Sequence, residues 1–428
     1  MKNKVQNTAI VVLTVTAILL FVWTAVQRTG FFGGAATTAE LVGESRQAGP
    51  LMPVCAVINN GETCSLLSET RLLTPYFDAL RPVLVELLGS AADPTAVTEA
   101  QWCDAIGQKG VLLDYGAVLP IAAVRGNAES QLTGLSVDSL LISLTEELAK
   151  VYVYADGVCY VSTTALKTGD LETSLLGNEG RAVCYAYTLG DMAASLTPHS
   201  AVPLEVRTGG SLMRTPLCDA YGSYERERQA LLLEAFGFDS YTTRSYADAS
   251  SGRVFLAENG TLRAGGDGSL TYVATEGSVI TARTISGDSA MCVNTASVIL
   301  SECISGLTNA PRYVLSAVET DGDRTTASFD AWYDGAVLVA ENGSRIAARF
   351  VFDGEQLVQA EISLFTVTVS EADVAVPTLS PQVLLAGLRG DETVGRLSRA
   401  WLACDGKWSA TYCVLPNVRG GNGAGGNG

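Results

Sequence analysis

Turn-forming Asn-Gly and Asp-Gly dipeptides recur at short intervals in the second half of this chain. They stand at Asn259-Gly260, Asp321-Gly322, Asp334-Gly335, Asn342-Gly343 and Asp353-Gly354. Each separates two strand-like runs, and such dipeptides readily adopt the positive φ angles of a tight hairpin. Strands joined so briefly pair antiparallel, because a parallel pair needs a crossover of a dozen residues or more. The second half is therefore restricted to antiparallel sheets.

Helical spacing of apolar residues interrupts the strands in a few places. The expected helices are Leu66–Leu88, Thr95–Ile106, Tyr221–Phe236, Ala290–Leu307 and Pro381–Leu388. The expected strands are Ser139–Leu144, Lys150–Ala155, Val158–Thr163, Val254–Ala257, Thr261–Ala264, Leu270–Ala274, Tyr313–Val318, Thr325–Trp332, Ala336–Glu341, Arg345–Phe352, Leu357–Val369, Arg396–Leu402 and Ser409–Leu415, with further strands within Val111–Val124. Runs of strands followed by a helix predict an α+β fold with helices packed on antiparallel sheets.

The N-terminus carries an uncharged apolar run, Ala9–Val26. A helix needs roughly 20 such residues to cross a bilayer, so residues 9–27 are predicted to be a transmembrane helix. Lys2 and Lys4 precede it and only Arg28 follows closely, which favours a cytoplasmic stub at 1–8 and an exported remainder. The alternative is a cleaved secretory signal, since small residues follow at 33–36. Both interpretations export the chain.

The remaining organisation follows from changes in composition and period. The expected segments are a linker at 28–53, a mainly helical membrane-proximal domain at 54–135, α+β domains at 136–283 and 284–419, and a disordered glycine-rich tail at 420–428. Lys and Arg number 28 against 45 Asp and Glu, a net charge of -17. Such a surface repels nucleic acid, whose binding depends on clustered basic residues.

Motifs for catalysis are scarce. His199 is the single histidine, and its Thr197-Pro198-His199-Ser200 context predicts a solvated loop residue rather than a catalytic base. The sequence holds no G-x-S-x-G, no S-x-x-K and no P-loop, and Asp321-Gly322-Asp323 is interpreted as a polar turn. Paired carboxylates stay open, because sequence does not reveal spatial pairs. We therefore predict no catalytic, cofactor-binding or metal-binding residues, and no cofactor.

The chain has ten cysteines and no C-x-x-C pair. Cys55 and Cys64 flank one turn, and Cys404 and Cys413 flank another, so each pair could staple a hairpin in an exported protein. The alternative is buried free thiols that pack as small apolar groups. Sequence leaves the two alternatives open.

One stretch carries a family resemblance. Within Phe238–Glu276, the strand Val254–Glu258, the turn Gly260–Arg263 and the run Asp267–Tyr272 resemble the YycH/YycI family of membrane-anchored regulators. In addition, Asp138–Thr164 is similar to a hairpin region of the YycH type, and Arg396–Val418 to the terminal strand pair of the YycI type. By this resemblance, 136–283 is YycH-like and 284–419 is YycI-like.

The resemblance implies a non-enzymatic, extracytoplasmic regulator of the sensor histidine kinase of the Gram-positive YycFG (WalRK) two-component system, which controls cell-wall metabolism. The expected partners are that kinase and a paralogous regulator in the membrane. Thr14, Ala17, Phe21 and Thr24 share one face of the predicted transmembrane helix and are the expected partner interface. The alternatives are a lipid-facing helix, an exported structural or ligand-binding surface protein, and an exported hydrolase with a carboxylate site.

Overall fold

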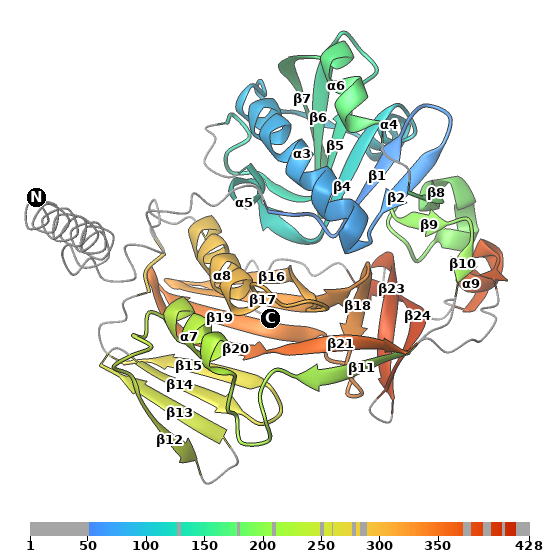
Figure 1. Ribbon diagram of the computed structural model, residues 1–428. Coiled ribbons are helices and arrows are strands. Elements are labelled where there is room, and N and C mark those ends of the chain that lie inside the picture. The colour runs from blue at the N-terminus through green and yellow to red at the C-terminus, as the bar shows by residue number, and fades with distance from the viewer. Residues whose placement is uncertain are drawn as a thin grey trace, which may run out of the picture.

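The computed structural model describes residues 51–416 apart from 126–129, 178–179, 208–210, 249–251, 259, 276–279, 283–288, 371–377, 388–394 and 405–406. The expected α+β class is confirmed: two large, mostly antiparallel sheets are accompanied by a few helices (Figure 1). Among these described residues, no helix is both long and apolar enough to cross a membrane. The expected transmembrane helix, its interface residues Thr14, Ala17, Phe21 and Thr24, and the tail lie outside the described residues.

The first sheet, sheet A, has nine strands in the order β3-β7-β6-β5-β4-β1-β2-β8-β9, each antiparallel to its neighbours. Its strands are β1 (Cys55–Asn59), β2 (Cys64–Leu67), β3 (Thr95–Val97), β4 (Gly110–Pro120), β5 (Ser136–Ser143), β6 (Leu148–Ala155), β7 (Val158–Lys167), β8 (Arg181–Tyr185) and β9 (Ala201–Pro203). The accompanying helices are α3 (Thr70–Gly89), α4 (Glu99–Ile106), α5 (Ile121–Arg125), α6 (Thr168–Leu175) and the 3-10 helix η1 (Ala186–Ala193).

Helices cover both faces of sheet A, and the sequence of its central strands shows why. Successive side chains of a strand point to opposite faces. Val111 and Leu113 of β4 therefore join the core beneath α3, whereas Leu112 between them packs with Trp102 of α4. The central strands are consequently apolar on both faces over most of their length, and each fully buried apolar side chain contributes roughly 1.5–3 kcal/mol.

The second sheet, sheet B, has thirteen described strands in the order β12-β13-β14-β15-β20-β19-β17-β18-β23-β24-β11-β21, with β16 also paired to β17. Its strands are β11 (Ser211–Pro216), β12 (Arg244–Asp248), β13 (Gly252–Ala257), β14 (Gly260–Gly265), β15 (Ser269–Ala274), β16 (Arg312–Asp321), β17 (Arg324–Tyr333), β18 (Ala336–Val339), β19 (Ile346–Asp353), β20 (Gln356–Ser363), β21 (Phe365–Ser370), β23 (Gly395–Cys404) and β24 (Lys407–Pro416). Only β18 and β23 pair in parallel among these, so the expectation of antiparallel pairs alone in the second half was wrong at this pair. The short strands β10 (Val206–Arg207) and β22 (Thr378–Leu379) form a separate pair.

Two helices lie on one face of sheet B: α7 (Arg226–Ala235) and α8 (Ala290–Cys303) (Figure 1). Gly237, shortly after the end of α7, has a φ of 70°, a conformation that favours glycine at the end of a helix. Phe236, which directly follows the last residue of α7, stacks on Tyr272 of β15 with 5.1 Å between the ring centroids. The remaining helix, α9 (Pro381–Gly387), packs against η1 beside sheet A.

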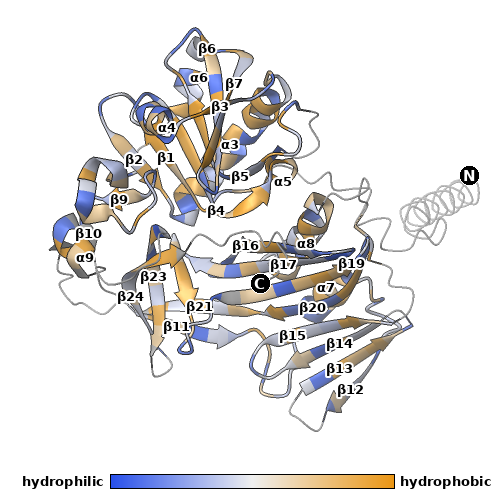
Figure 2. Ribbon diagram, turned by 180° about the vertical axis from the view of Figure 1, so that it is seen from behind, coloured by the Kyte–Doolittle hydropathy of each residue, from blue (hydrophilic) through white to orange (hydrophobic). Residues whose placement is uncertain are grey.

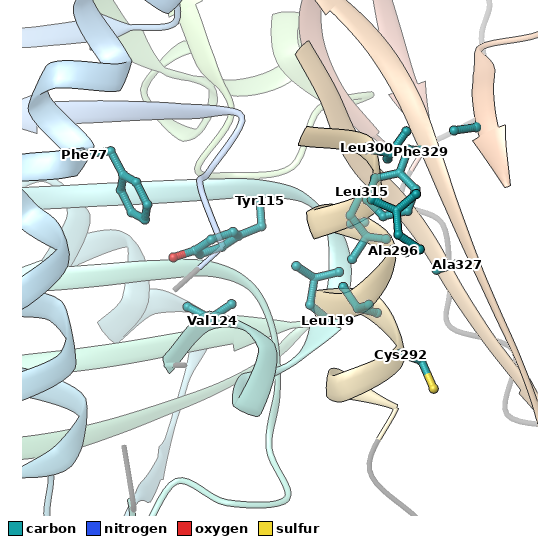
Figure 3. Close-up of a cluster of buried hydrophobic side chains, with 14 of the residues drawn as sticks. Phe77, Tyr115, Leu119, Val124, Cys292, Ala296, Leu300, Leu315, Ala327 and Phe329 are labelled. Atoms are coloured by element: carbon teal, nitrogen blue, oxygen red, sulfur yellow. The ribbon is translucent and has the colours of Figure 1, made fainter. Parts of the chain in front are cut away.

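Helix α8 lies at the seam between the two sheets (Figure 3). Tyr115 and Leu119 of β4 approach it from sheet A, and Leu315 and Phe329 lie on its other side (Figure 3). These residues belong to one continuous cluster of buried apolar side chains that also contains Leu300 of α8. The two sheets therefore share a core.

The expected division at 135/136 falls between β4 and β5, which are paired strands of the same sheet. The segment 54–135 contributes strands β1 to β4 as well as helices. The expected division at 283/284 separates strands that likewise belong to one sheet, since β15 pairs with β20. The organisation seen is two sheets with a common core.

Several boundaries also differ from expectation. Val111–Val124 is one bulged strand followed by α5, and Leu357–Val369 is divided at Leu364 into β20 and β21. The hairpins expected at Asp321-Gly322, Asp334-Gly335 and Asp353-Gly354 are confirmed, and Asp156-Gly157 joins β6 to β7 in the same way. The hairpin expected at Asn342-Gly343 was wrong, because β18 and β19 on either side of it both pair with β17 and not with each other.

Of the two alternatives left open for the cysteines, the described residues show free thiols, and neither possible staple is formed. Cys64 pairs with Asn59 rather than Cys55, and Cys413 pairs with Ser398 rather than Cys404. The nine cysteines with described side chains are free thiols. In each of the two hairpins, the strand register places the two cysteines at positions that are not opposite each other.

Candidate functional site

A bulge in β4 shapes the most unusual polar feature of the molecule. Asp114 pairs with Ser139 of β5, but the next paired residue of β4 is Leu119, which lies opposite Val137. Gly116 within the bulge has a φ of 73°, and its N–H donates to Asp114 Oδ1 at 2.8 Å. Asp138 lies opposite the bulge, between the two paired residues of β5, so two carboxylates lie on adjoining strands.

Arg396 of β23 reaches both carboxylates from sheet B. Its Nη1 donates to Asp114 Oδ1, and its Nη2 lies 3.0 Å from Asp138 Oδ1. Arg396 is only 6% exposed and Asp138 only 1%. A buried charge is stable only with such partners, so these residues form a charged joint between the sheets.

The loop 195–200 fastens the start of β23 next to this joint. Thr197 N–H donates to Gly395 O at 2.8 Å, Gly395 N–H to Ser195 O at 3.1 Å, and Leu397 N–H to Ser200 Oγ at 2.9 Å. These bonds satisfy strand-edge groups that would otherwise need water. They fix Arg396 at the seam.

His199 of this loop is buried, so the prediction of a solvated residue was wrong. It is 1% exposed, and its ring lies 4.7 Å from that of Tyr154 and 5.7 Å from that of Trp102. A turn, in which Ser200 N–H donates to Thr197 O at 2.9 Å, brings the loop back on itself. Aromatic contacts in the core outweigh the preference of this polar sequence for solvent.

The joint has an unbalanced charge. Asp114 and Asp138 face one guanidinium, and His199 Nε2 lies 4.0 Å from Asp138 Oδ1. Burial, and next Arg396, lower the pKa of His199 well below its ordinary value, so the imidazole is neutral. Burial raises the pKa of Asp138 to about 6; Arg396 opposes this shift and Asp114 adds to it. The joint therefore takes up a proton in mildly acidic solution.

A nucleophile and its base at the joint would have to be Ser200 and His199. Neither ring nitrogen of His199 has a hydrogen-bond partner in the described part of the chain, and Ser200 Oγ accepts from a backbone N–H. A serine nucleophile needs a hydrogen bond to its base. His199 and Ser200 do not form that pair in this arrangement. Within the described ranges, no group of three His, Cys, Asp or Glu side chains is arranged to hold a metal ion.

A pocket of about 70 Å³ opens beside the joint, between sheets A and B. We call it the seam pocket. Its walls carry Arg181, Arg396, Arg399 and Tyr412 together with apolar side chains from both sheets. Its volume is well below the roughly 300–1,000 Å³ that is typical of small-ligand sites.

A second feature is the side of β12–β15 that faces away from α7 (Figure 2). Phe255, Leu262 and Tyr272 are buried on the helix side. We call the opposite side the outer face. The strand registers place on it Arg244, Tyr246, Asp248, Val254, Leu256, Thr261, Arg263, Ser269, Thr271 and Val273, of which Val254 is buried. Tyr246, Leu256 and Val273 are 50%, 42% and 49% exposed.

Sequence reasoning did not identify Asp114, Asp138 and Arg396 as a group. One signal was available: Asp138 interrupts an otherwise apolar strand, Val137–Ile142, together with Ser139. A carboxylate in a buried strand calls for a cationic partner. Nothing local indicates that this partner is Arg396.

Comparison with protein-family models, with curated proteins and with solved structures found no match for this chain.

Proposed function

We propose that this chain is a membrane-anchored, extracytoplasmic and non-enzymatic regulator that binds a sensor histidine kinase of a cell-wall-controlling two-component system. The observation that carries the proposal is the outer face of β12–β15. This is also the segment whose sequence resembles the YycH/YycI family. The function is binding, and the outer face is the surface that binds.

Exposed side chains of the outer face suit a protein partner. Tyr246, Leu256 and Val273 lie on three of its four strands, and each is about half exposed. Single exposed apolar residues are ordinary, but several on one sheet face, next to arginine, have the composition of a contact surface. The aromatic and arginine side chains there are the types that dominate binding energy.

Charge gives the outer face a preference among partners. Arg244 and Arg263 are exposed on it, and Asp248 lies on the same side of β12. Arg349 continues the row of Arg263 beyond Glu361. This local excess of positive charge stands in a chain of net charge -17. Complementary charge orients partners and speeds association. The matching surface on the kinase is acidic.

The edge of the sheet offers a further mode of contact. β12 ends the strand order of sheet B, and its residues Arg244 to Ala247 are exposed. An exposed edge strand presents unpaired N–H and C=O groups to which an extended segment can add. Strand addition at β12 would extend the contact from the face to its rim.

The anchor supplies the second half of the proposal. Residues 9–27 hold the body at the membrane, and the helix face of Thr14, Ala17, Phe21 and Thr24 contacts the kinase within the bilayer. Small and hydroxyl-bearing side chains allow two helices to approach closely. A paralogous regulator is the other partner expected there.

Co-purification tests both contacts. Full-length chain is captured from membranes of its own cells, and the histidine kinase in the eluate is quantified. Leu256→Asp and Tyr246→Asp on the outer face are expected to reduce captured kinase about tenfold or more, since each buries an unpaired charge in the interface. Val369→Asp is the matched control, because Val369 is 50% exposed on β21, away from the outer face.

Replacement of residues 9–27 by an unrelated transmembrane helix tests the second contact, and it is expected to weaken capture and change kinase output. The proposal would be overturned if all variants captured equal amounts of kinase and if kinase output stayed normal in cells that carry the variant with the unrelated transmembrane helix.

A further inference from the structure

A second cavity, of about 330 Å³, lies where α8 meets both sheets, and we call it the α8 pocket. Its wall comes mainly from α8, from β4 of sheet A and from β16 of sheet B, and Figure 3 shows four of the wall residues, Leu119, Leu300, Leu315 and Phe329. The volume falls within the range of roughly 300–1,000 Å³ that is typical of small-ligand sites. At about 30 Å³ for each water molecule, it offers the space of about eleven waters, which suits a ligand of about a dozen non-hydrogen atoms.

Arg312 of β16 brings a positive charge to this wall without a neighbouring anion. Its Nη1 and Nη2 donate to Pro53 O and Val54 O, each at 3.0 Å. Among the described residues no carboxylate forms an ion pair with it, and burial lowers its pKa to about 10, a shift that only the Cys55 thiol opposes. A guanidinium has five N–H groups, so three are left for a ligand. One of these, on Nε, has no partner in the described ranges and keeps accessible surface.

Asn294 of α8 is a second polar group of the wall that lacks a protein partner. It is 5% exposed, and its side-chain amide makes no hydrogen bond within the described part of the chain. The amide atoms are not among the fully enclosed polar atoms, so the small surface that they keep opens into the pocket. Buried polar groups nearly always have a hydrogen-bond partner, and here only a molecule in the pocket can be that partner.

The charge of the α8 pocket is positive. Arg81 of α3 and Arg312 are the charged residues of its wall, and no acidic residue from the described part of the chain lines it. Asp78 lies 3.2 Å from Arg81, but these two side chains are 58% and 44% exposed, so solvent screens the pair. Even when this pair is counted as neutral, the charge of Arg312 remains. The pocket therefore favours an anion over a neutral or cationic molecule.

Most of the remaining wall residues are apolar, among them Leu119, Val298, Ile304, Val314 and Leu315. A ligand that fills this space gains by burying apolar surface, and its charged end is left to the polar groups. From the uncompensated cation, the unpartnered amide and the apolar wall together, we infer that the α8 pocket binds a small amphiphilic monocarboxylate, such as a medium-chain fatty acid or an arylalkanoic acid. Arg312 pairs with the carboxylate, and the Asn294 amide donates to it. This inference does not depend on the outer face or on any kinase.

Octanoate and hydrocinnamate are the probes, with octanamide and hydrocinnamamide as the matched uncharged compounds and acetate as the anion without an apolar body. Binding is measured by titration calorimetry on the full-length chain in lipid nanodiscs, with empty nanodiscs as the blank for partition into lipid. At least one of the two acids is expected to bind saturably, with a Kd of about 1 mM or tighter for a ligand of this size. The two amides and acetate are expected to bind at least about tenfold more weakly.

Two variants assign the binding to the α8 pocket. Asn294→Leu replaces the amide by an apolar side chain of similar size and is expected to weaken binding of the acids about fivefold. Arg312→Gln removes the charge but keeps an amide that can donate to Pro53 O, and it is expected to weaken binding about tenfold or more. Thr295→Val on α8 and Arg71→Gln on α3 are the matched controls, because neither residue lines the pocket.

Urea unfolding of each variant establishes that it is folded before titration, and Asn294→Leu decides the outcome alone if Arg312→Gln does not fold. The inference is overturned if neither acid binds saturably, or if an amide or acetate binds as well as the acids. It is also overturned if the folded pocket variants bind the acids as tightly as the two controls do.

Discussion

Arg396 donates to the carboxylate of Asp114, which lies 282 residues earlier in the chain. The contact joins β23 of sheet B to the bulged strand β4 of sheet A, and Asp138 of β5 is the second carboxylate that Arg396 reaches. The C-terminal hairpin therefore locks onto the first sheet by burying a cation between two anions. Stability, pH response and the geometry of the seam all depend on this joint.

Replacing Arg396 by methionine is expected to destabilise the protein strongly. The change leaves Asp114 and Asp138 buried and uncompensated, and breaking a buried ion pair in this way costs about 3–5 kcal/mol. Urea unfolding of the two proteins measures the difference in free energy. Arg349→Met, at an exposed arginine of β19, is the control and is expected to change stability by less than about 0.5 kcal/mol. Equal effects of the two substitutions would show that the joint carries no special stability.

Asp138→Asn is expected to alter the pH dependence of stability. The folded pKa of Asp138 is about 6, above its ordinary value of 3.8, so the folded state holds a proton that the unfolded state releases between these values. This contribution is absent above pH 6 and grows as the pH falls toward 4. The wild type should therefore gain about 1–3 kcal/mol on the variant between pH 7 and pH 4. Parallel stability curves for the two proteins would contradict the assignment.

His199→Phe is expected to have the opposite pH signature. The folded pKa of His199 lies well below its ordinary 6.5, so only the unfolded state binds a proton as the pH falls below that value. The wild type should lose stability relative to the variant by about 1.4 kcal/mol per pH unit below 6.5, until the folded histidine titrates. Phenylalanine keeps the ring contacts with Tyr154 and Trp102. Thermal unfolding from pH 7 to pH 5 measures the slope, and a constant difference would mean that His199 is accessible and ordinary.

Phe329→Ala is expected to destabilise both sheets together. Phe329 lies beside α8 in the core that the sheets share, and removing a buried phenylalanine costs about 3–5 kcal/mol (Figure 3). Because the core is continuous, the wild type and the variant should each unfold in one transition. Hydrogen exchange resolved by peptide, with segments from β5 and β19 compared, reports each sheet separately. Loss of protection in β19 alone would show that the sheets are independent.

Much of the secondary structure follows from local sequence. The Asp-Gly turns set positive φ angles at Asp156 and Asp334, and the strands on either side pair as expected. Apolar spacing likewise places α8 within the predicted Ala290–Leu307. These signals act over a few residues, so sequence patterns report them directly.

Features that depend on distant partners were not predictable in the same way. The bulge after Asp114 and the division at Leu364 are set by which strand lies alongside, and Leu364 N–H donates to Gly268 O across the sheet. His199 is buried because Tyr154 and Trp102 come to it from other elements. A polar loop sequence by itself predicts exposure to solvent, and the residues of this loop do not indicate its contacts with distant aromatic side chains.

Photocrosslinking in living cells tests the proposed kinase contact most directly. A photoreactive amino acid replaces Tyr246 or Leu256 of the outer face in the full-length chain, or Val369 of β21 as the control, and adducts are identified by mass spectrometry. We predict that both outer-face positions form an adduct with a membrane histidine kinase and that the control position does not. Adducts of equal yield from Val369, or none with any kinase from the outer face while the chain keeps normal kinase output, would contradict the account.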